Sequence, residues 1–165
     1  MFKLGDQVLY GAHGVCRIVS IEQRRVDRKN IEYYVLSPVS NATTCFYIPM
    51  HSEKALSKLS PLLSKAELMR ILQTQSIADD PWIEDENTRK QHTKEVLSSG
   101  DHAELIRWVR TMHLHRRLLQ EMGKKFHQSD ESFLKDAEKI LTTEFAIVLN
   151  ISEDSVRNCI QQMAI

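Results

Sequence analysis

The sequence is poor in the residues that mark several large classes of protein. Its 165 residues include only five glycines, four prolines and three cysteines. So little glycine and proline excludes a collagen-like or low-complexity chain, and 42% hydrophobic residues exclude a wholly disordered one. Cys16, Cys45 and Cys159 are odd in number and widely spaced. We therefore expect no disulfide framework and a reducing, cytoplasmic environment.

Long apolar runs and an excess of one charge are also missing. No run approaches the roughly 20 apolar residues that span a bilayer, and the N-terminal segment lacks the apolar stretch of a signal peptide. The 22 Lys and Arg equal the 22 Asp and Glu. This balance argues against a protein that coats nucleic acid by net charge, but it allows a local basic face.

The chain changes character near residue 53. Before it, short runs rich in Val, Ile, Tyr and Thr predict strands, separated by turn residues, at 6–10, 15–21, 31–39 and 43–48. The polar residues 24–30 are expected to form a hairpin tip. Four or five short strands in so few residues predict a small Tudor-like or SH3-like β-barrel with a thin core.

After residue 53 the apolar residues recur at helical spacing. Ser64 with Glu67, and Asp101 with Glu104, have capping-box spacing and predict two helix starts. Further helices are expected at 52–59, at 87–97 with an end at Gly100, from 129 and from 152, where serines could cap them. The sequence thus predicts an α+β fold, with a β-barrel domain at 1–53 and an all-helical domain at 54–165.

No residue pattern supports catalysis, a metal or a cofactor. His113 and His115 lie two apart, so on a helix they point to different faces, and no partner completes a zinc spacing. Cys16 and Cys45 lie in predicted strands and are expected to be small core residues. The sequence has no Gly-rich phosphate loop and no nucleophile-elbow motif. We expect the protein not to be an enzyme.

Two segments are candidates for DNA contact by their charge or pattern. Residues 146–157 resemble a helix-turn-helix, but Glu153 and Asp154 would meet phosphates, so core packing is the favoured interpretation. Residues 107–127 hold six Lys or Arg against the single acid Glu121. Lys124 and Lys125 fall in a loop between helices. Either these cations bind phosphate or they form an ordinary solvated face.

Trp82 is unusual because it follows Pro81 in a loop flanked by acids. Two interpretations are open. The ring packs under the loop, or it is an exposed apolar wedge of the kind that some proteins press against base steps.

Motifs along most of the chain resemble those of CarD-type bacterial transcription regulators, whose N-terminal module is similar to the polymerase-interacting domain of transcription-repair coupling factor. In the first half they are FKLGDQVLY at 2–10, HGV at 13–15, YYVL at 33–36 and YIP at 47–49. In the second half they are Trp82, Arg89, SGD at 99–101, and the helical AE at 137–138 and EFA at 144–146.

The resemblance implies a function. Family members bind a lobe of the RNA polymerase β subunit by extending its sheet with an edge strand. Their helical domain contacts promoter DNA at the upstream edge of the melted region without reading a defined operator. A tryptophan there wedges into the minor groove and stabilises the open complex.

The resemblance also implies site residues. The polymerase-binding candidates are Arg24, Arg25, Phe46 and Tyr47, with Tyr47 standing where other members have an arginine. The DNA-binding candidates are Trp82, Arg89, Lys90, Lys124 and Lys125. Acids occupy 84–86, where basic residues usually follow the tryptophan.

We expect a monomeric regulator without cofactor or membrane contact, associated with the nucleoid through polymerase. Two alternatives remain open: a polymerase-binding module that makes little or no DNA contact, and a free-standing helix-turn-helix operator binder. Exposure of Trp82 favours the leading interpretation, whereas burial favours the polymerase-binding module.

Overall fold

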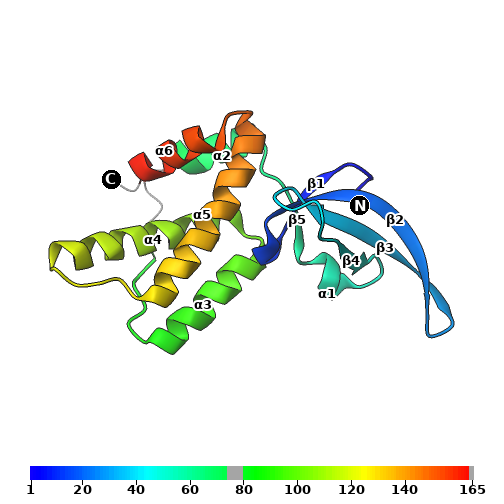
Figure 1. The fold of residues 1–165 in the computed structure, drawn as a ribbon, viewed down its shortest axis with the longest axis horizontal. Coiled ribbons are helices and arrows are strands. Elements are labelled where there is room, and N and C mark those ends of the chain that lie inside the picture. Colours follow the sequence, from blue (N-terminus) through cyan, green and yellow to red (C-terminus); the bar gives the residue numbers. More distant parts are fainter. Residues whose placement is uncertain (74–79, 164–165) are drawn as a thin grey trace. The chain divides into compact units, whose positions relative to one another are not determined.

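The computed structural model describes residues 1–73 and 80–163, without the side chains of 72–73 and 159–163. It divides into two compact units, Met1–Leu62 and Leu63–Ile165. The first is an antiparallel sheet and the second is helical (Figure 1). The predicted α+β class is therefore confirmed.

The N-terminal unit is a five-stranded antiparallel sheet in the order β4-β3-β2-β1-β5. Its elements are β1 (Gln7–Tyr10), the 3-10 turn η1 (Gly11–His13), β2 (Val15–Val26), β3 (Lys29–Pro38), β4 (Phe46–Pro49), α1 (Glu53–Leu56) and β5 (Leu59–Pro61). The unit ends at Leu62 rather than near residue 53, because β5 pairs with β1 and completes the sheet.

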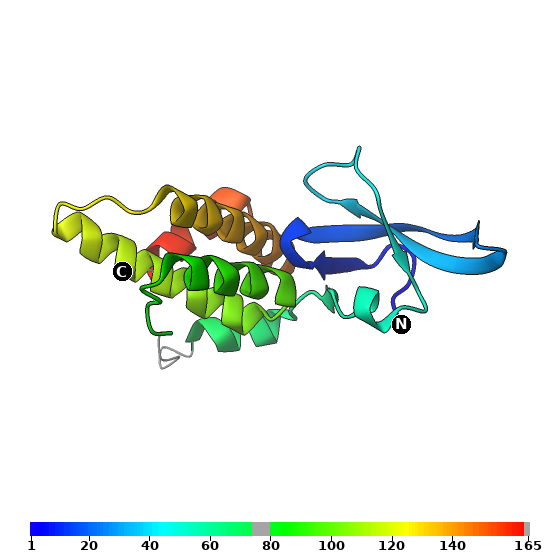
Figure 2. The same cartoon turned by 90° about the horizontal axis from the view of Figure 1, so that it is seen from below.

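The β2–β3 hairpin is longer than its sequence suggested. The strands stay paired as far as Val26 and Lys29, so the turn is only Asp27 and Arg28, both with positive φ. A two-residue turn with two positive φ angles matches the right-handed twist of the flanking strands. Figure 2 shows the hairpin as a long projecting ribbon. Apart from Val26, the residues at the hairpin end are polar, so this part of the sequence has no alternating apolar pattern that would predict a strand.

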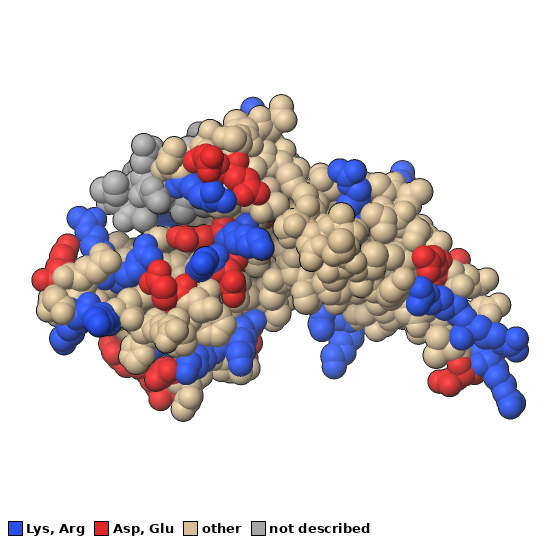
Figure 3. Space-filling model, viewed as in Figure 1, with Lys and Arg blue, Asp and Glu red and all other residues tan. Residues whose placement is uncertain are grey.

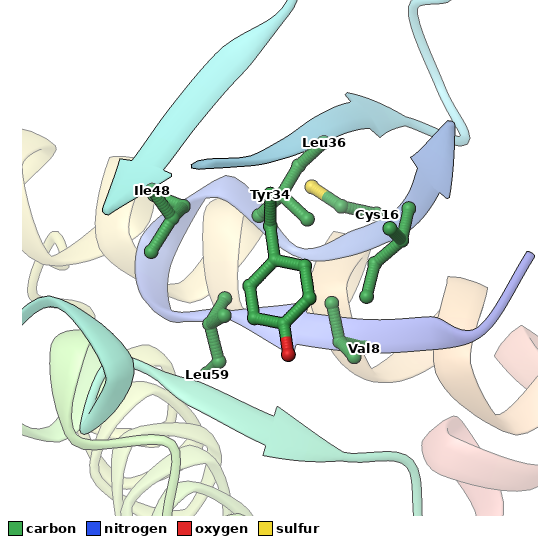
Figure 4. Close-up of a cluster of buried hydrophobic side chains, with 7 residues drawn as sticks. Val8, Cys16, Tyr34, Leu36, Ile48 and Leu59 are labelled. Carbon is green, nitrogen blue, oxygen red and sulfur yellow. The ribbon is translucent and has the colours of Figure 1, made fainter. Parts of the chain in front are cut away.

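One buried cluster forms the core of this unit: Val8, Cys16, Ile18, Tyr34, Leu36, Ile48 and Leu59 (Figure 4). The Tyr34 hydroxyl donates a hydrogen bond of 3.2 Å to the Phe2 carbonyl. Burial raises the pKa of the Cys16 thiol to about 11, so this cysteine is an inert core residue, as predicted. The same prediction is wrong for Cys45, which is exposed because β4 begins only at Phe46.

The C-terminal unit contains α2 (Lys65–Gln73), α3 (Glu86–Ser99), α4 (His102–Glu121), α5 (Gln128–Leu149) and α6 (Glu153–Met163). Helix α5 packs against each of the other four. The buried apolar residues at its centre include Leu105, Trp108 and Met112 of α4, and Leu134, Leu141 and Phe145 of α5. Val156 of α6 is also buried, whereas the side chains of Ile160 and Met163 lie outside the described set.

Most predicted helix ends are confirmed. Ser64 and Glu67 form the reciprocal capping box, with the two backbone N–H groups donating to side-chain oxygens at 2.9 and 3.2 Å. Asp101 accepts from the Glu104 N–H, and Gly100 ends α3 in the left-handed conformation. The Ser129 cap is wrong: the N-cap of α5 is His127, two residues earlier, and the Ser129 hydroxyl is buried without a described hydrogen-bond partner.

The described helices do not meet the length and apolarity that crossing a bilayer demands.

Candidate protein and nucleic-acid interfaces

Arg24 and Tyr47 form an exposed pair on the N-terminal sheet. The Arg24 guanidinium carbon lies 3.7 Å from the centre of the Tyr47 ring. The Nη2 and Nε atoms of Arg24 also donate hydrogen bonds of 3.0 and 3.2 Å to one carboxylate oxygen of Glu22. This hydrogen bonding raises the pKa of the arginine. Arg24 and Tyr47 nevertheless remain 46% and 41% exposed. The structure thus brings together two of the predicted polymerase-binding residues in a fixed and accessible arrangement.

Arg25 and Phe46 do not join this pair. Successive side chains of a strand point to opposite faces, so Arg25 points away from Arg24 and Phe46 points away from Tyr47. Phe46 is half-buried against the core cluster, and its ring lies 4.4 Å from His13 and 5.3 Å from Tyr10. Phe46 therefore packs the end of the sheet, whereas Arg25 remains exposed on the hairpin.

Strand β4 lies at one end of the strand order, beside β3. An edge strand presents backbone N–H and C=O groups that a further strand can pair with. Tyr47 belongs to β4, so the exposed pair stands directly at this edge. Strand β5 forms the opposite edge.

The tip of the β2–β3 hairpin is strongly basic. Arg24, Arg25, Arg28 and Lys29 lie within six consecutive residues and are all exposed. Figure 3 shows Lys and Arg side chains gathered at the far end of this hairpin. Sequence reasoning singled out Arg24 and Arg25 but missed Arg28 and Lys29, although their clustering with the other two was a visible signal.

Trp82 precedes α3 and is neither exposed nor fully buried. Its ring lies parallel to the His115 ring, with centres 3.6 Å apart and an angle of 8° between the planes. It also lies 6.1 Å from the parallel Trp108 ring, and the Arg89 guanidinium is 4.6 Å from its centre. The tryptophan is thus packed over much of its surface and keeps a solvent-accessible part.

The position of Arg89 contradicts its predicted role in DNA contact. It was expected to contact DNA, but its side chain is only 3% exposed and is paired with the buried carboxylate of Asp130 at 2.9–3.1 Å. Its remaining terminal nitrogen donates to the carbonyls of Ile83 and Glu84 at 2.8 and 3.1 Å. Arg89 therefore ties the Trp82 segment and α3 to α5, and it is not available to a phosphate.

The acids after Trp82 also have local roles. Asp85 accepts from the Thr88 N–H at 2.8 Å and caps α3, and this bonding with Thr88 lowers the aspartate pKa. Glu86 forms an ion pair with Lys90 one turn along the helix. Lys90 is half-exposed, and the ion pair partly neutralises its charge. It is therefore a weaker candidate for DNA contact than its sequence position suggested.

Three of the six cations in the 107–127 stretch have acidic partners. Arg107 pairs with Asp80, Arg116 with Glu131 and Arg117 with Glu121, at 3.2–3.6 Å. Figure 3 accordingly shows the two charge signs intermixed over the helical unit on the face that it presents. Lys124 and Lys125 differ. They are exposed after Gly123 and form no ion pair within the described residues.

Comparison with known proteins agrees with this division of the chain. The family model for the CarD-like/TRCF RID domain matches residues 2–60, and the model for the CarD C-terminal domain matches residues 67–161. The chain belongs to the CarD family. YdeB of Bacillus subtilis (strain 168), whose name presents it as a candidate transcription factor, is 25% identical over 162 residues, which is 96% of this chain and 99% of that protein.

Membership of the CarD family links the chain to transcription regulation through interaction with RNA polymerase. The RID domain is Tudor-like, as the strand pattern predicted for the N-terminal half. The two matched regions fall one in each compact unit, so the N-terminal sheet corresponds to the RID domain and the helical unit to the CarD C-terminal domain.

The helix-turn-helix alternative finds little electrostatic support in this CarD-family chain. The first turn of α6 is exposed, but Arg157 is paired with Glu153 and Asp154 at 3.1 and 2.9 Å. Two carboxylates against one neutralised arginine oppose entry into a phosphate-lined groove.

His113 and His115, both of α4, each contact a side chain from another segment. His113 lies buried with its Nε2 atom 2.6 Å from a Glu138 carboxylate oxygen. His115 stacks on Trp82 instead. Within the described residues, no group of three or more His, Cys, Asp or Glu is arranged to hold a metal ion.

Proposed function

We propose that this CarD-family protein binds the β subunit of RNA polymerase through its N-terminal sheet and stabilises the promoter open complex through its helical unit. It acts by binding rather than by catalysis. The observation that carries this proposal is the exposed Arg24–Tyr47 pair at the β4 edge, within the region that matches the RID domain model.

The polymerase contact combines backbone and side-chain interactions. The unpaired edge of β4 receives a strand of the β subunit, which supplies main-chain hydrogen bonds. Arg24 is held by Tyr47 and Glu22, so it loses little conformational freedom when it meets a carboxylate of the partner. The basic hairpin tip favours the same acidic surface.

The DNA contact is weak and depends on polymerase. Lys124 and Lys125 supply two exposed cations for phosphates, and the accessible part of Trp82 stacks at the edge of the melted region. Because the chain has no net charge, free DNA attracts it little. Binding to polymerase raises the local concentration of the helical unit at the promoter, which makes the weak contact sufficient.

A polymerase-binding module without a DNA wedge is the second candidate function. The partial packing of Trp82 and the burial of Arg89 favour it, because both reduce the surface offered to DNA. The two functions differ in one measurable respect. Only the first requires Trp82 for the lifetime of the open complex once polymerase is bound.

The polymerase contact is tested by measuring the affinity of the full chain for purified RNA polymerase. Arg24→Glu should weaken binding by about tenfold or more, because it replaces a charge-assisted contact with repulsion. Arg17→Glu is the matched control, since it makes the same charge change at an exposed arginine of the same strand, outside the hairpin tip. Equal losses for both variants would reduce the effect to net charge, and unchanged binding by Arg24→Glu would remove Arg24 from the interface.

A further inference from the structure

His115 and Trp82 form the tightest ring contact in the described part of the helical unit. Their ring centres are 3.6 Å apart and their planes are nearly parallel, at 8°. His115 belongs to α4, whereas Trp82 belongs to a segment without regular secondary structure before α3. Backbone hydrogen bonding therefore does little to set the plane of the indole, and the ring takes the orientation of the surface on which it packs.

The residues that contact Trp82 differ in whether they anchor its backbone or orient its ring. Arg89 is committed to Asp130 and to the carbonyls of Ile83 and Glu84, so it anchors the backbone that follows the tryptophan. Trp108 is 6.1 Å away and Phe126 is 6.4 Å away at a tilt of 43°. Among the aromatic rings of the described residues, only that of His115 is both parallel to the indole and within van der Waals stacking distance of it. Its ring is thus the flat surface that sets the plane of Trp82.

The charged groups around His115 come from three segments. Burial has the largest effect on its imidazole and lowers the pKa; Glu84 raises this pKa, Arg89 of α3 lowers it and Asp130 raises it, in decreasing order of effect. The histidine is therefore neutral at neutral pH and presents an uncharged aromatic face to the indole. Protonation would place a cation in a partly buried site near Arg89.

We infer that His115 is a positioning residue for Trp82, whose imidazole ring holds the indole in the plane that meets the nucleobase at the edge of the melted region. This inference rests on the proposed function of Trp82. It adds a residue that makes no contact with DNA itself and acts through the tryptophan, so that the indole is ordered before DNA arrives.

The experiment compares open-complex lifetimes for the full chain with RNA polymerase and a promoter fragment. His115→Ala should shorten the lifetime about two- to tenfold, the range that one aromatic pair supports, and should add nothing in a Trp82→Ala background. His115→Phe should retain most of the lifetime, because it keeps a flat ring. If His115→Ala does not fold, His115→Leu replaces it, since leucine fills similar space without a ring. The exposed His127→Ala is the matched control and should behave as wild type.

A spectroscopic readout tests the stack without polymerase. The difference in emission between wild type and Trp82→Phe isolates the Trp82 signal from that of Trp108. A protonated imidazole quenches an indole stacked on it, so this signal should fall on acidification. Because burial lowers the pKa of His115, the midpoint of the fall should lie below the ordinary histidine value of about 6.5. The fall should be absent in His115→Phe and retained in His127→Ala.

Several results would overturn the inference. One is a wild-type lifetime for His115→Ala when Trp82→Ala shortens it, and another is a double variant whose loss is the product of the two single losses. A Trp82 signal that titrates unchanged in His115→Phe would overturn it as well. If Trp82→Ala itself has a wild-type lifetime, the proposed DNA function fails, and the fluorescence titration still shows whether His115 orders the indole.

Discussion

The two units each place an arginine over an aromatic ring, and the two pairs are built for opposite purposes. In the N-terminal sheet, Arg24 lies over Tyr47 at 3.7 Å and is 46% exposed. In the helical unit, Arg89 lies over Trp82 at 4.6 Å and is 3% exposed. The same kind of contact is thus exposed at the surface in one unit and is an internal link between segments in the other.

The carboxylate partners explain the difference. Glu22 is near Arg24 on the same strand and is itself partly exposed, so both charges stay hydrated and their pairing stabilises the fold little. Asp130 is 41 residues from Arg89 and is 1% exposed, so neither charge can return to water without disrupting the helix packing. An arginine in a motif indicates a binding site only when its partner leaves it accessible.

The largest expected difference between the two arginines is in the free energy of unfolding. Arg89→Ala should cost about 3–5 kcal/mol, because it leaves the Asp130 carboxylate buried and unpaired. A loss of that size lowers the melting temperature of the helical unit by roughly 10 °C or more. Thermal denaturation followed by circular dichroism measures it, with Arg24→Ala as the control that should melt as wild type. An Arg89→Ala protein of unchanged stability would contradict the internal role of this pair.

Trp82 is less exposed than Arg24 and less buried than Arg89. Its replacement shows whether it contacts DNA or only packs the helical unit. Trp82→Ala should shorten the open-complex lifetime several-fold while polymerase binding persists, because loss of about 1.4 kcal/mol corresponds to a factor of ten. Trp82→Phe should retain part of the effect. The lifetime is measured by competitor challenge on a preformed complex. A large drop in melting temperature without a lifetime effect would assign Trp82 to the core.

Lys124 and Lys125, unlike the buried Arg89, are exposed and can contact phosphates. Changing Lys124 and Lys125 together to Ala should reduce the salt slope of DNA binding by about two phosphate contacts, whatever the DNA sequence. The measurement is DNA affinity at several salt concentrations. The control pair is Lys135 and Lys139, two exposed lysines of α5 in the same unit. An equal change of slope in the control would show a net-charge effect only.

The smallest expected effect concerns the surface pair itself. Tyr47→Ala should weaken polymerase binding about two- to fivefold, the range for an exposed cation–π contact, and Tyr47→Phe should keep most of the affinity. Titration of labelled full-length variants against polymerase measures both. A Tyr47→Phe protein as weak as Tyr47→Ala would shift the role of Tyr47 from its ring to its hydroxyl group.

Local sequence signals determined a large part of this structure. Ser64 with Glu67, Gly100 and Asp101 placed helix ends correctly, because a cap acts through bonds that span only a few residues. Alternation and turn residues located most of the strands, and motifs in both halves pointed to the CarD family. The Ser129 cap failed because an equally local competitor, the turn at His127, starts α5 earlier.

Long-range packing decided the rest. Strand β5 exists because β1 offers it an edge, and three residues carry too short a pattern to predict it. The pairing of Arg89 with Asp130 and the stacking of Trp82 on His115 join segments far apart in the chain, and no spacing rule connects them. The sequence by itself determined which residues were available for function. Only the tertiary structure decided which of them stay in water and which are buried, because burial depends on partners that local pattern does not specify.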